Sequence, residues 1–255
     1  MIKILLYGCN GYMGRVVTEM VKNNTSTIIT AGIDTNTEQQ GDYPVYADPD
    51  KISEQVDVII DFSNPSALNN LLKFGTEKNI PIILCATGYS SDQINEISKA
   101  SEQIPIFRSG NMSLGINLLA DLIKRTCTVL GEDFDVEIVE KHHRRKVDAP
   151  SGTALMLADA AAESLPYKPE YVFERKSNSK PRDKKEIGIS SVRGGTIIGV
   201  HDVIFAGQDE VIELRHTAAS RDVFASGALK AAKFIINKRP GMYNMKDVLK
   251  DSIDI

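Results

Sequence analysis

Near its N-terminus the chain contains the stretch Ile2-Lys-Ile-Leu-Leu-Tyr-Gly8, followed by Cys-Asn-Gly11-Tyr-Met-Gly14. Residues 2–7 are typical of a buried β-strand, and residues 15–23 have the apolar spacing of an amphipathic helix. A glycine-rich turn between a strand and a helix lets backbone N–H groups approach a phosphate, at a helix end that favours anions. The stretch therefore predicts the phosphate-binding unit of a parallel sheet.

The alternation of strand and helix patterns continues through residue 112. We expect further strands at 27–33, 55–62, 80–86 and 104–107, with helices at 67–78 and 92–102. Short β-branched runs that alternate with longer amphipathic stretches are typical of βαβ units. The region is therefore predicted to be an α/β domain built on a parallel sheet.

Asp34 supports a dinucleotide as the ligand of this domain. It ends the second predicted strand, where a carboxylate can accept hydrogen bonds from an adenosine ribose. Thr35 follows it, so no arginine stands there for a 2′-phosphate; this favours NADH, while basic residues elsewhere could still admit NADPH. The glycine spacing G-x-x-G-x-x-G differs from G-x-G-x-x-G, and a ligand-free turn is the alternative. Ligands bind beyond the carboxyl ends of strands, so residues 85–88 and 109–112 should approach the nicotinamide.

The pattern changes after residue 112. We expect a long helix at 114–130, a strand at 133–139, a helix at 154–165 and an exposed polar loop at 174–186. Strands at 196–205 and 210–216 flank Gly207-Gln208-Asp209 as an antiparallel hairpin, and a helix follows at 225–237. The middle of the chain is therefore predicted to be α+β, with a last helix that could return to the first domain.

Composition excludes several classes of protein. The chain has 30 Lys and Arg against 34 Asp and Glu, a net charge of −4, so neither a nucleic acid nor a membrane surface is expected as a partner. Its three cysteines form no C-x-x-C pair, which argues against a disulfide framework and a cysteine-rich zinc site. No apolar run approaches the ~18 residues that a membrane span needs, and the first residues do not resemble a signal peptide. We expect a cytoplasmic protein with no metal.

A basic, histidine-containing segment is the second candidate site. Glu140-Lys-His-His-Arg-Arg-Lys146 precedes Val147-Asp-Ala-Pro-Ser-Gly-Thr153, which starts a predicted helix. Imidazoles beside four cations repel one another unless an anion neutralises them, so a small polyanionic ligand is indicated. Hydroxyls and amides at a helix start suit a carboxylate. The alternatives are a plain helix N-cap, a solvated basic run and adventitious metal binding by the histidine pair.

The segment 140–154 closely resembles the signature of the 4-hydroxy-tetrahydrodipicolinate reductases, also called dihydrodipicolinate reductases, of the bacterial lysine and diaminopimelate pathway. The resemblance extends over nearly the whole chain and includes the segments 8–14, 86–88, 110–115, 193–195, 199–202 and 216–227 together with Asp34. It implies a Rossmann-like dinucleotide-binding domain, residues 1–112 with 221–255, and a substrate-binding and tetramerisation domain with a mixed sheet, residues 113–220. It also implies hydride transfer from NADH or NADPH to a cyclic dicarboxylate in a homotetramer.

The resemblance further implies roles for individual residues. His142 would be the proton donor and acceptor, and Lys146 the second proton donor. The substrate contacts would be His143, Ser151, Gly152 and Thr153, with Arg221 as an additional anion contact. The cofactor contacts would be Gly8, Cys9, Asn10, Gly11, Tyr12, Met13, Asp34, Cys85, Ala86, Thr87, Ser109, Gly110, Asn111 and Met112.

The sequence leaves two alternatives to the reductase activity that the resemblance implies. One is a different NAD(P)-dependent reductase or dehydrogenase, acting on another small dicarboxylate or amino acid; its site would not need His142, His143 and Lys146 beside Ser-Gly-Thr. The other is a dinucleotide-sensing regulator. That function predicts a helix-turn-helix and a basic face, and the sequence has neither.

Overall fold

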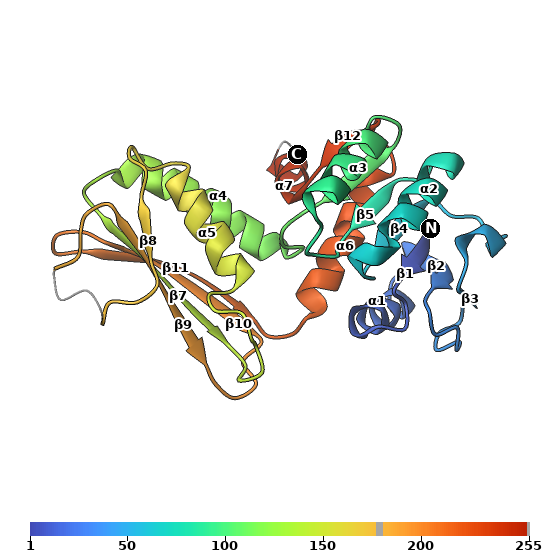
Figure 1. Cartoon of the computed structure of the whole chain (residues 1–255), viewed down its shortest axis with the longest axis horizontal. Coiled ribbons are helices and arrows are strands. Elements are labelled where there is room, and N and C mark those ends of the chain that lie inside the picture. The colour runs from blue at the N-terminus through green and yellow to red at the C-terminus, as the bar shows by residue number, and fades with distance from the viewer. Residues whose placement is uncertain (177–180, 254–255) are drawn as a thin grey trace. The chain divides into compact units, whose positions relative to one another are not determined.

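The computed structural model describes residues 1–176 and 181–253. The chain divides into two compact units, which Figure 1 shows with their elements labelled. The first unit is Met1–Leu114 with Arg221–Ile255, and the second unit is Gly115–Ser220. The helix after residue 220 therefore belongs to the same unit as the N-terminal strand.

A seven-stranded sheet forms the centre of the first unit. Its order is β12-β6-β5-β4-β1-β2-β3, and every neighbouring pair is parallel, which confirms the predicted parallel sheet. The strands are β1 (Ile2–Tyr7), β2 (Thr27–Ile33), β3 (Val45–Tyr46), β4 (Val58–Asp61), β5 (Ile82–Leu84), β6 (Pro105–Arg108) and β12 (Gly241–Tyr243). Because β2 and β4 lie on opposite sides of β1, the chain reverses direction across the sheet at the end of β1, where α/β sheets bind ligands.

Helices cover both faces of this sheet. One apolar cluster joins the sheet to α1 (Tyr12–Lys22), α6 (Asp222–Ile235) and α7 (Met245–Ile253). A second cluster joins the opposite face to α2 (Leu68–Lys78) and α3 (Ser91–Ser101), with short 3-10 turns at Pro49–Lys51 and Pro65–Ala67. The α3 helix starts where a capping box of Ser90 and Gln93 satisfies backbone donors. The first unit is therefore a doubly wound, Rossmann-like layer structure.

The second unit is built on a five-stranded mixed sheet, as predicted. Its order is β11-β10-β7-β9-β8, with β10 antiparallel to β7 and β11, and β9 parallel to β7 and β8. Figure 1 shows α4 (Leu114–Leu130) and α5 (Gly152–Ala162) lying on one face. The strands are β7 (Asp135–His142), β8 (Glu170–Val172), β9 (Glu186–Arg193), β10 (Gly199–Ala206) and β11 (Val211–Ala218). Alternate residues such as Ile138, Val203 and Phe205 form the core beneath the helices.

Several sequence predictions need correction. The strand expected at 133–139 runs on to His142, so Glu140 and His142 are strand residues rather than part of a following loop. The strand β9 was missed because Gly188, Ser190 and Ser191 interrupt the apolar alternation on which strand prediction depends. A Cβ atom on Gly188 would lie 1.8 Å from Glu137 Oε2 on β7, so a larger residue there would displace the Glu137 carboxylate. The short elements β3, β8, β12 and α7 were also missed.

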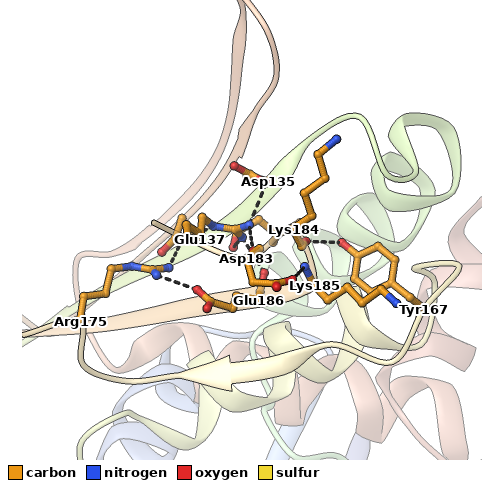
Figure 2. Close-up of polar contacts among 10 residues, drawn as sticks. Asp135, Glu137, Tyr167, Arg175, Asp183, Lys184, Lys185 and Glu186 are labelled. Carbon is orange, nitrogen blue, oxygen red and sulfur yellow. Dashed lines mark hydrogen bonds and ion pairs between the residues drawn. The ribbon is translucent and has the colours of Figure 1, made fainter. Parts of the chain in front are cut away.

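The loop expected to be exposed at 174–186 is partly ordered by ion pairs. Residues 177–180 lie outside the described part of the chain, but both flanks are held against β7, as Figure 2 shows for Arg175, Glu137 and Glu186. Arg182 donates to Glu137 Oε1 at 2.9 Å, to Asp135 Oδ1 at 2.8 Å and to three backbone carbonyls. Its side chain is only 17% exposed. The prediction of an exposed loop is confirmed for residues 174–176, 181 and 183–185, but it is wrong for Arg182, which is half-buried, and for Glu186, which is buried, because basic and acidic side chains pair there.

Arg182→Gln should lower the free energy of unfolding by about 2–4 kcal/mol, because it removes the hydrogen bonds that a 17% exposed guanidinium donates to two carboxylates and three backbone carbonyl oxygens. The matched control is Arg125→Gln on α4, whose ion pair with Asp121 joins side chains that are 70% and 43% exposed; its loss should cost at most about 1 kcal/mol. Urea unfolding curves would measure both. Equal effects of the two variants would contradict the central role given to Arg182.

Candidate functional site

The glycine loop of the first unit is closed by backbone contacts that need the absence of side chains. Gly8 has a φ of 71°, and a Cβ on it would lie 2.7 Å from the carbonyl oxygen of Phe62. A Cβ on Gly14 would lie 2.2 Å from the carbonyl oxygen of Gly8, so this glycine lets α1 pack on the loop. Gly11 is the N-cap of α1 and supplies no capping side chain. The first turn of α1 therefore presents amides suited to a phosphate.

Asp34 follows β2 and is tied to the glycine loop. Its carboxylate accepts hydrogen bonds from the backbone N–H of Asn10 at 3.0 Å and of Asn36 at 3.1 Å. The Asn10 side chain donates to the carbonyl oxygens of Asn36 and Glu38. Since a carboxylate offers about four acceptor positions, Asp34 retains capacity for ribose hydroxyls. Asn10 thus fixes the segment after β2 beside the predicted adenosine position.

A cavity of about 270 Å³ lies at the carboxyl end of the parallel sheet. Three segments that are distant in sequence line it, and most were predicted cofactor contacts: Met13, Cys85, Thr87, Ser109, Gly110, Asn111 and Met112. Phe62 and Phe224 complete the lining and were not predicted. Burial raises the pKa of Cys85, so its side chain is a neutral thiol. Size and apolar lining suit a flat aromatic ring such as nicotinamide.

Asp61, also unpredicted, holds the segment that carries Phe62. It is 1% exposed, and its carboxylate accepts hydrogen bonds from the N–H of Ser63 at 2.9 Å and from the hydroxyl of Tyr89 at 3.3 Å. Burial raises the pKa of Asp61, against the lowering effect of these hydrogen bonds. An acidic residue at the end of the buried strand 58–61 is the sequence signal that could have revealed it.

In the second unit, imidazoles gather at one end of the mixed sheet. The chain has four histidines: His142 ends β7, His143 follows it, and His201 on β10 pairs in register with His216 on β11. His142 and His201 are in edge-to-face contact, with ring centroids 5.2 Å apart. The sequence predicted His142 and His143 as site residues but not His201 or His216. Those two residues are distant in the chain and reach the site only through the register of β10 with β7 and β11.

Glu140 and Arg193 are the buried ion pair beneath these histidines, and neither was predicted. Arg193 donates to both carboxylate oxygens, at 2.7 and 2.8 Å. The Nδ1 atom of His142 lies 2.6 Å from Glu140 Oε2. Burial raises the pKa of Glu140, but hydrogen bonds from Arg193 and His142 outweigh it and lower the value to about 2. Burial lowers the pKa of His142, and the Glu140 carboxylate partly offsets this effect.

The predicted Ser-Gly-Thr segment forms the start of α5. Ser151 is its N-cap: Oγ accepts a hydrogen bond from the N–H of Ala154 and lies 3.1 Å from Nε2 of His201. Ser151 is only 2% exposed, so the plain N-cap interpretation holds for this hydroxyl. Around Gly152 a Cβ atom would meet nothing within 4 Å. The backbone at Gly152 and Thr153 is therefore the part of the segment that a carboxylate can approach.

The basic segment after β7 is held to the turn after β9. The N–H of Gly194 donates to the carbonyl oxygen of His142 at 2.9 Å, and the N–H of Arg144 donates to that of Gly195 at 3.3 Å. The Nζ atom of Lys146 lies 2.8 Å from Asp148 Oδ1, and the lysine side chain is 22% exposed. Nδ1 of His143 is buried and has no hydrogen-bond partner among residues 1–176 and 181–253. Cations and an unpaired imidazole donor or acceptor thus lie together beside the start of α5.

Arg221 is the residue with which the chain re-enters the first unit, directly after Ser220. Its guanidinium carbon is 4.7 Å from the centre of the Tyr12 ring, at the start of α1. This contact adds positive charge to the glycine loop. Across residues 1–176 and 181–253, no group of three or more His, Cys, Asp or Glu side chains is arranged to hold a metal ion.

Comparison with known proteins identifies relatives of both units. The family model described as dihydrodipicolinate reductase, N-terminus, matches residues 2–112, and the model described as dihydrodipicolinate reductase, C-terminus, matches residues 115–249. A 4-hydroxy-tetrahydrodipicolinate reductase of Caldanaerobacter subterraneus subsp. tengcongensis is 52% identical over 250 residues, 98% of this chain and 99% of that protein. One of Clostridium tetani is 51% identical over 249 residues, with 98% and 97% coverage.

A solved structure has the same fold. It is a dipicolinate-bound dihydrodipicolinate reductase from Paenisporosarcina sp. TG-14, with a TM-score of 0.81, 24% sequence identity, and coverage of 96% of this chain and 97% of that one. At this identity the likeness establishes the shared two-unit fold.

The buried imidazoles predict a loss of stability in acid. Burial, followed by the nearby His142, lowers the pKa of His201 from 6.5 to about 4. Between these values the unfolded chain binds a proton that the folded chain does not, so the free energy of unfolding should fall as pH drops from about 6.5 to about 4, by up to ~1.4 kcal/mol per pH unit for this site. Denaturant titrations of the wild-type protein and His201→Gln across this range would show a shallower pH slope for the variant. Identical slopes would contradict the assignment.

Proposed function

The chain belongs to the dihydrodipicolinate reductase family, and from that membership we propose that it reduces 4-hydroxy-tetrahydrodipicolinate to tetrahydrodipicolinate, a step toward diaminopimelate and lysine. The observation that carries the proposal is that both family models match, at residues 2–112 and 115–249, and that a reductase of this activity shares 52% of its residues over 98% of the chain. The relative named as dipicolinate-bound supports a cyclic dicarboxylate as the substrate class.

The first unit is proposed to hold NADH or NADPH, which supplies the hydride when bound. The residues present fit such a group. A side chain at Gly8 or Gly14 would collide with neighbouring backbone carbonyl oxygens, and the start of α1 has no capping side chain, so its amides remain available to a phosphate. Asp34 is proposed to accept ribose hydrogen bonds, which favours NADH, since Thr35 rather than a cation follows it. The full proposed contact set is Gly8, Cys9, Asn10, Gly11, Tyr12, Met13, Asp34, Cys85, Ala86, Thr87, Ser109, Gly110, Asn111 and Met112.

The second unit is proposed to bind the substrate carboxylates. His143 and the start of α5, residues 151–153, combine an unpaired imidazole nitrogen with helix N-terminal amides, which favour carboxylates. Ser151 is proposed to act there through its N-cap, which orients the first amides of α5, because its hydroxyl contacts Ala154 and His201 and its N–H donates to Glu140. Arg221 is proposed as an additional anion contact.

Proton transfer is proposed for His142 and Lys146. The reaction removes water from the hydroxylated ring and adds one hydride and one proton, so a positioned acid must deliver the proton. His142 is 9% exposed, and the lowered pKa keeps its ring neutral near pH 7, able to accept and return a proton. Lys146 is proposed as the second proton donor, for the hydroxyl that leaves as water, and its positive charge can stabilise negative charge on the ring.

We also propose that the protein is a cytoplasmic homotetramer paired through the open face of the mixed sheet. This face carries the apolar residues Val192 and Val211, 44% and 59% exposed, with Val139, Val200 and Ile204 half-buried. The same face carries Lys141, Asp202 and Arg215, whose charges are paired with one another, so the face combines apolar residues with neutralised charges. Exposed apolar residues on such a face favour association with a second copy. All three cysteines are free thiols, which supports a reducing compartment. In the described ranges, the helices are all too short or too polar to cross a bilayer.

The activity is tested by following reduced-nicotinamide absorbance with freshly made condensation product of pyruvate and aspartate semialdehyde. NADH and NADPH are run side by side. Consumption of the nicotinamide that depends on this product, with NADH preferred, is the expected result. A protein that oxidises neither dinucleotide with this substrate would refute the proposed function.

His142→Gln and Lys146→Ala should each lower kcat by about 10²–10⁴-fold, because each removes a proton donor or acceptor. The dissociation constant for NADH, measured by fluorescence titration, should stay within about twofold, since the proposed dinucleotide site is in the first unit. Full turnover in both variants would show that the proton-transfer roles are misassigned.

Sedimentation equilibrium should give a mass four times the 28.0 kDa of one chain. Ile204→Asp, on the open face of β10, should dissociate the assembly because it places a charge at an apolar interface. The control is Val129→Asp on α4, whose side chain is 82% exposed on the helical side of the sheet and should not matter. A monomeric wild-type protein would contradict the tetramer.

A further inference from the structure

The carboxylate of Glu140 is fully buried and fully used. Glu140 is 0% exposed on β7, a central strand of the mixed sheet. Oε1 accepts hydrogen bonds from the N–H of Ser151 at 3.1 Å and from Arg193 at 2.7 Å, while Oε2 accepts one from Arg193 at 2.8 Å and contacts Nδ1 of His142 at 2.6 Å. These four contacts, from three residues, occupy the acceptor positions that a carboxylate offers. The group has no capacity left for a ligand and acts on its neighbours instead.

Arg193 keeps this carboxylate ionised. It binds both oxygens in a forked arrangement, the geometry in which arginine recognises a carboxylate most specifically. It also donates to the carbonyl oxygen of Asp148 at 2.7 Å, in the segment that leads to α5. The resulting pKa of Glu140, about 2, leaves the group charged at every pH at which the folded enzyme would work.

An ionised carboxylate can only accept hydrogen bonds, and this fixes the state of His142. The 2.6 Å contact between Glu140 Oε2 and His142 Nδ1 therefore requires hydrogen on Nδ1. In the neutral ring the lone pair is then on Nε2. The opposite tautomer would place two lone pairs against each other inside the protein, without water to separate them.

Space is kept at Nε2 by a glycine. A Cβ atom on Gly199, the first residue of β10, would lie 3.2 Å from Nε2 of His142. With a side chain at position 199, no substrate atom could lie between that side chain and Nε2. The ring is thus anchored on its Nδ1 side and left clear on its Nε2 side.

We propose that Glu140, paired with Arg193, is the positioning residue that holds His142 in the Nδ1–H tautomer, so that proton exchange with the substrate takes place at Nε2 in the space left by Gly199. The inference rests on the proposed function, in which His142 exchanges a proton with the ring. It adds the atom at which exchange occurs and the group that selects it.

The titration of His142 depends on every charged group around it. Glu140 lies on its own strand, Arg193 on β9 and His201 on β10, while Lys146 and Asp148 lie in the segment after β7. Glu140 raises the pKa of His142, whereas Lys146 and Arg193 lower it. Loss of the Glu140 charge should therefore lower the pH at which His142 titrates.

The experiment measures the tautomer directly in deuterated protein labelled with ¹⁵N-histidine. Long-range ¹H–¹⁵N correlation spectra distinguish a protonated from an unprotonated ring nitrogen, and His142→Gln identifies the His142 signals among the four histidines. The wild-type enzyme should show a protonated Nδ1 and an unprotonated Nε2 at pH 8. In Glu140→Gln the two tautomers should mix, the titration of His142 should move to lower pH, and kcat should fall at least about a hundredfold.

Two further variants keep the test decisive. Glu140→Gln leaves the Arg193 guanidinium, 19% exposed, without its carboxylate partner. The double variant with Arg193→Gln removes both charges and should retain the fold while losing the tautomer preference. The matched control is Glu137→Gln, on the same strand but paired with Arg175 and Arg182. It loses ion pairs in the same sheet and should leave the His142 signals and the pH profile unchanged.

The outcomes separate this inference from the proposed function. Hydrogen on Nε2 in the wild-type enzyme, or an unchanged His142 titration and kcat in the folded Glu140 variants, would overturn the positioning role. An enzyme with the expected tautomer but no reduction of the substrate would support the geometry and refute the proposed function. A KM for NADH that rises while kcat is unchanged would also count against the positioning role.

Discussion

The buried carboxylate of Glu140 is the interaction on which the second unit depends. A charge at 0% exposure is tolerated only because Arg193, Ser151 and His142 surround it. Those partners come from β9, from the start of α5 and from β7 itself, so one group fixes three segments at the same end of the sheet. The basic segment that follows β7 is positioned by the same contacts, because the turn directly after Arg193 is hydrogen-bonded to the backbone of His142 and Arg144.

The first unit meets a different physical requirement with a different device. A dinucleotide carries phosphates, and backbone amides bind them well when the chain can approach closely. Close approach depends on missing side chains at Gly8 and Gly14, where a Cβ would collide with neighbouring carbonyl oxygens. The two units thus provide complementary chemistry: uncapped amides and Asp34 in one, imidazoles and cations in the other. A reductase of a dicarboxylate needs both, which is consistent with the family to which the chain belongs.

The predicted strands and helices agree with the structure where the local apolar pattern is strong. The predicted bounds of β1, β2 and α4 match those observed, because each has a continuous apolar run or a sustained helical periodicity. Prediction failed at β9, where the glycine lies against Glu137 of β7 and two serines interrupt the apolar alternation. It also failed at Arg182 in the loop 174–186, which appeared to be solvated but pairs with acidic residues more than 40 positions earlier in the chain. Propensity describes neighbours in sequence and carries no information about such distant partners.

The sequence by itself determined the parallel α/β sheet, the glycine turn, Asp34 and the residues of the basic segment, because the pattern that predicts each of these features lies within short stretches of consecutive residues. Only the tertiary structure decided which residues stand beside them. Glu140, Arg193, His201 and His216 come together through strand register. Phe62, which follows the buried Asp61, joins the cavity at the carboxyl end of the parallel sheet through the order of its strands. The physical reason is that burial assigns these groups their charge states and partners, and burial is a property of the packed sheets rather than of any one segment.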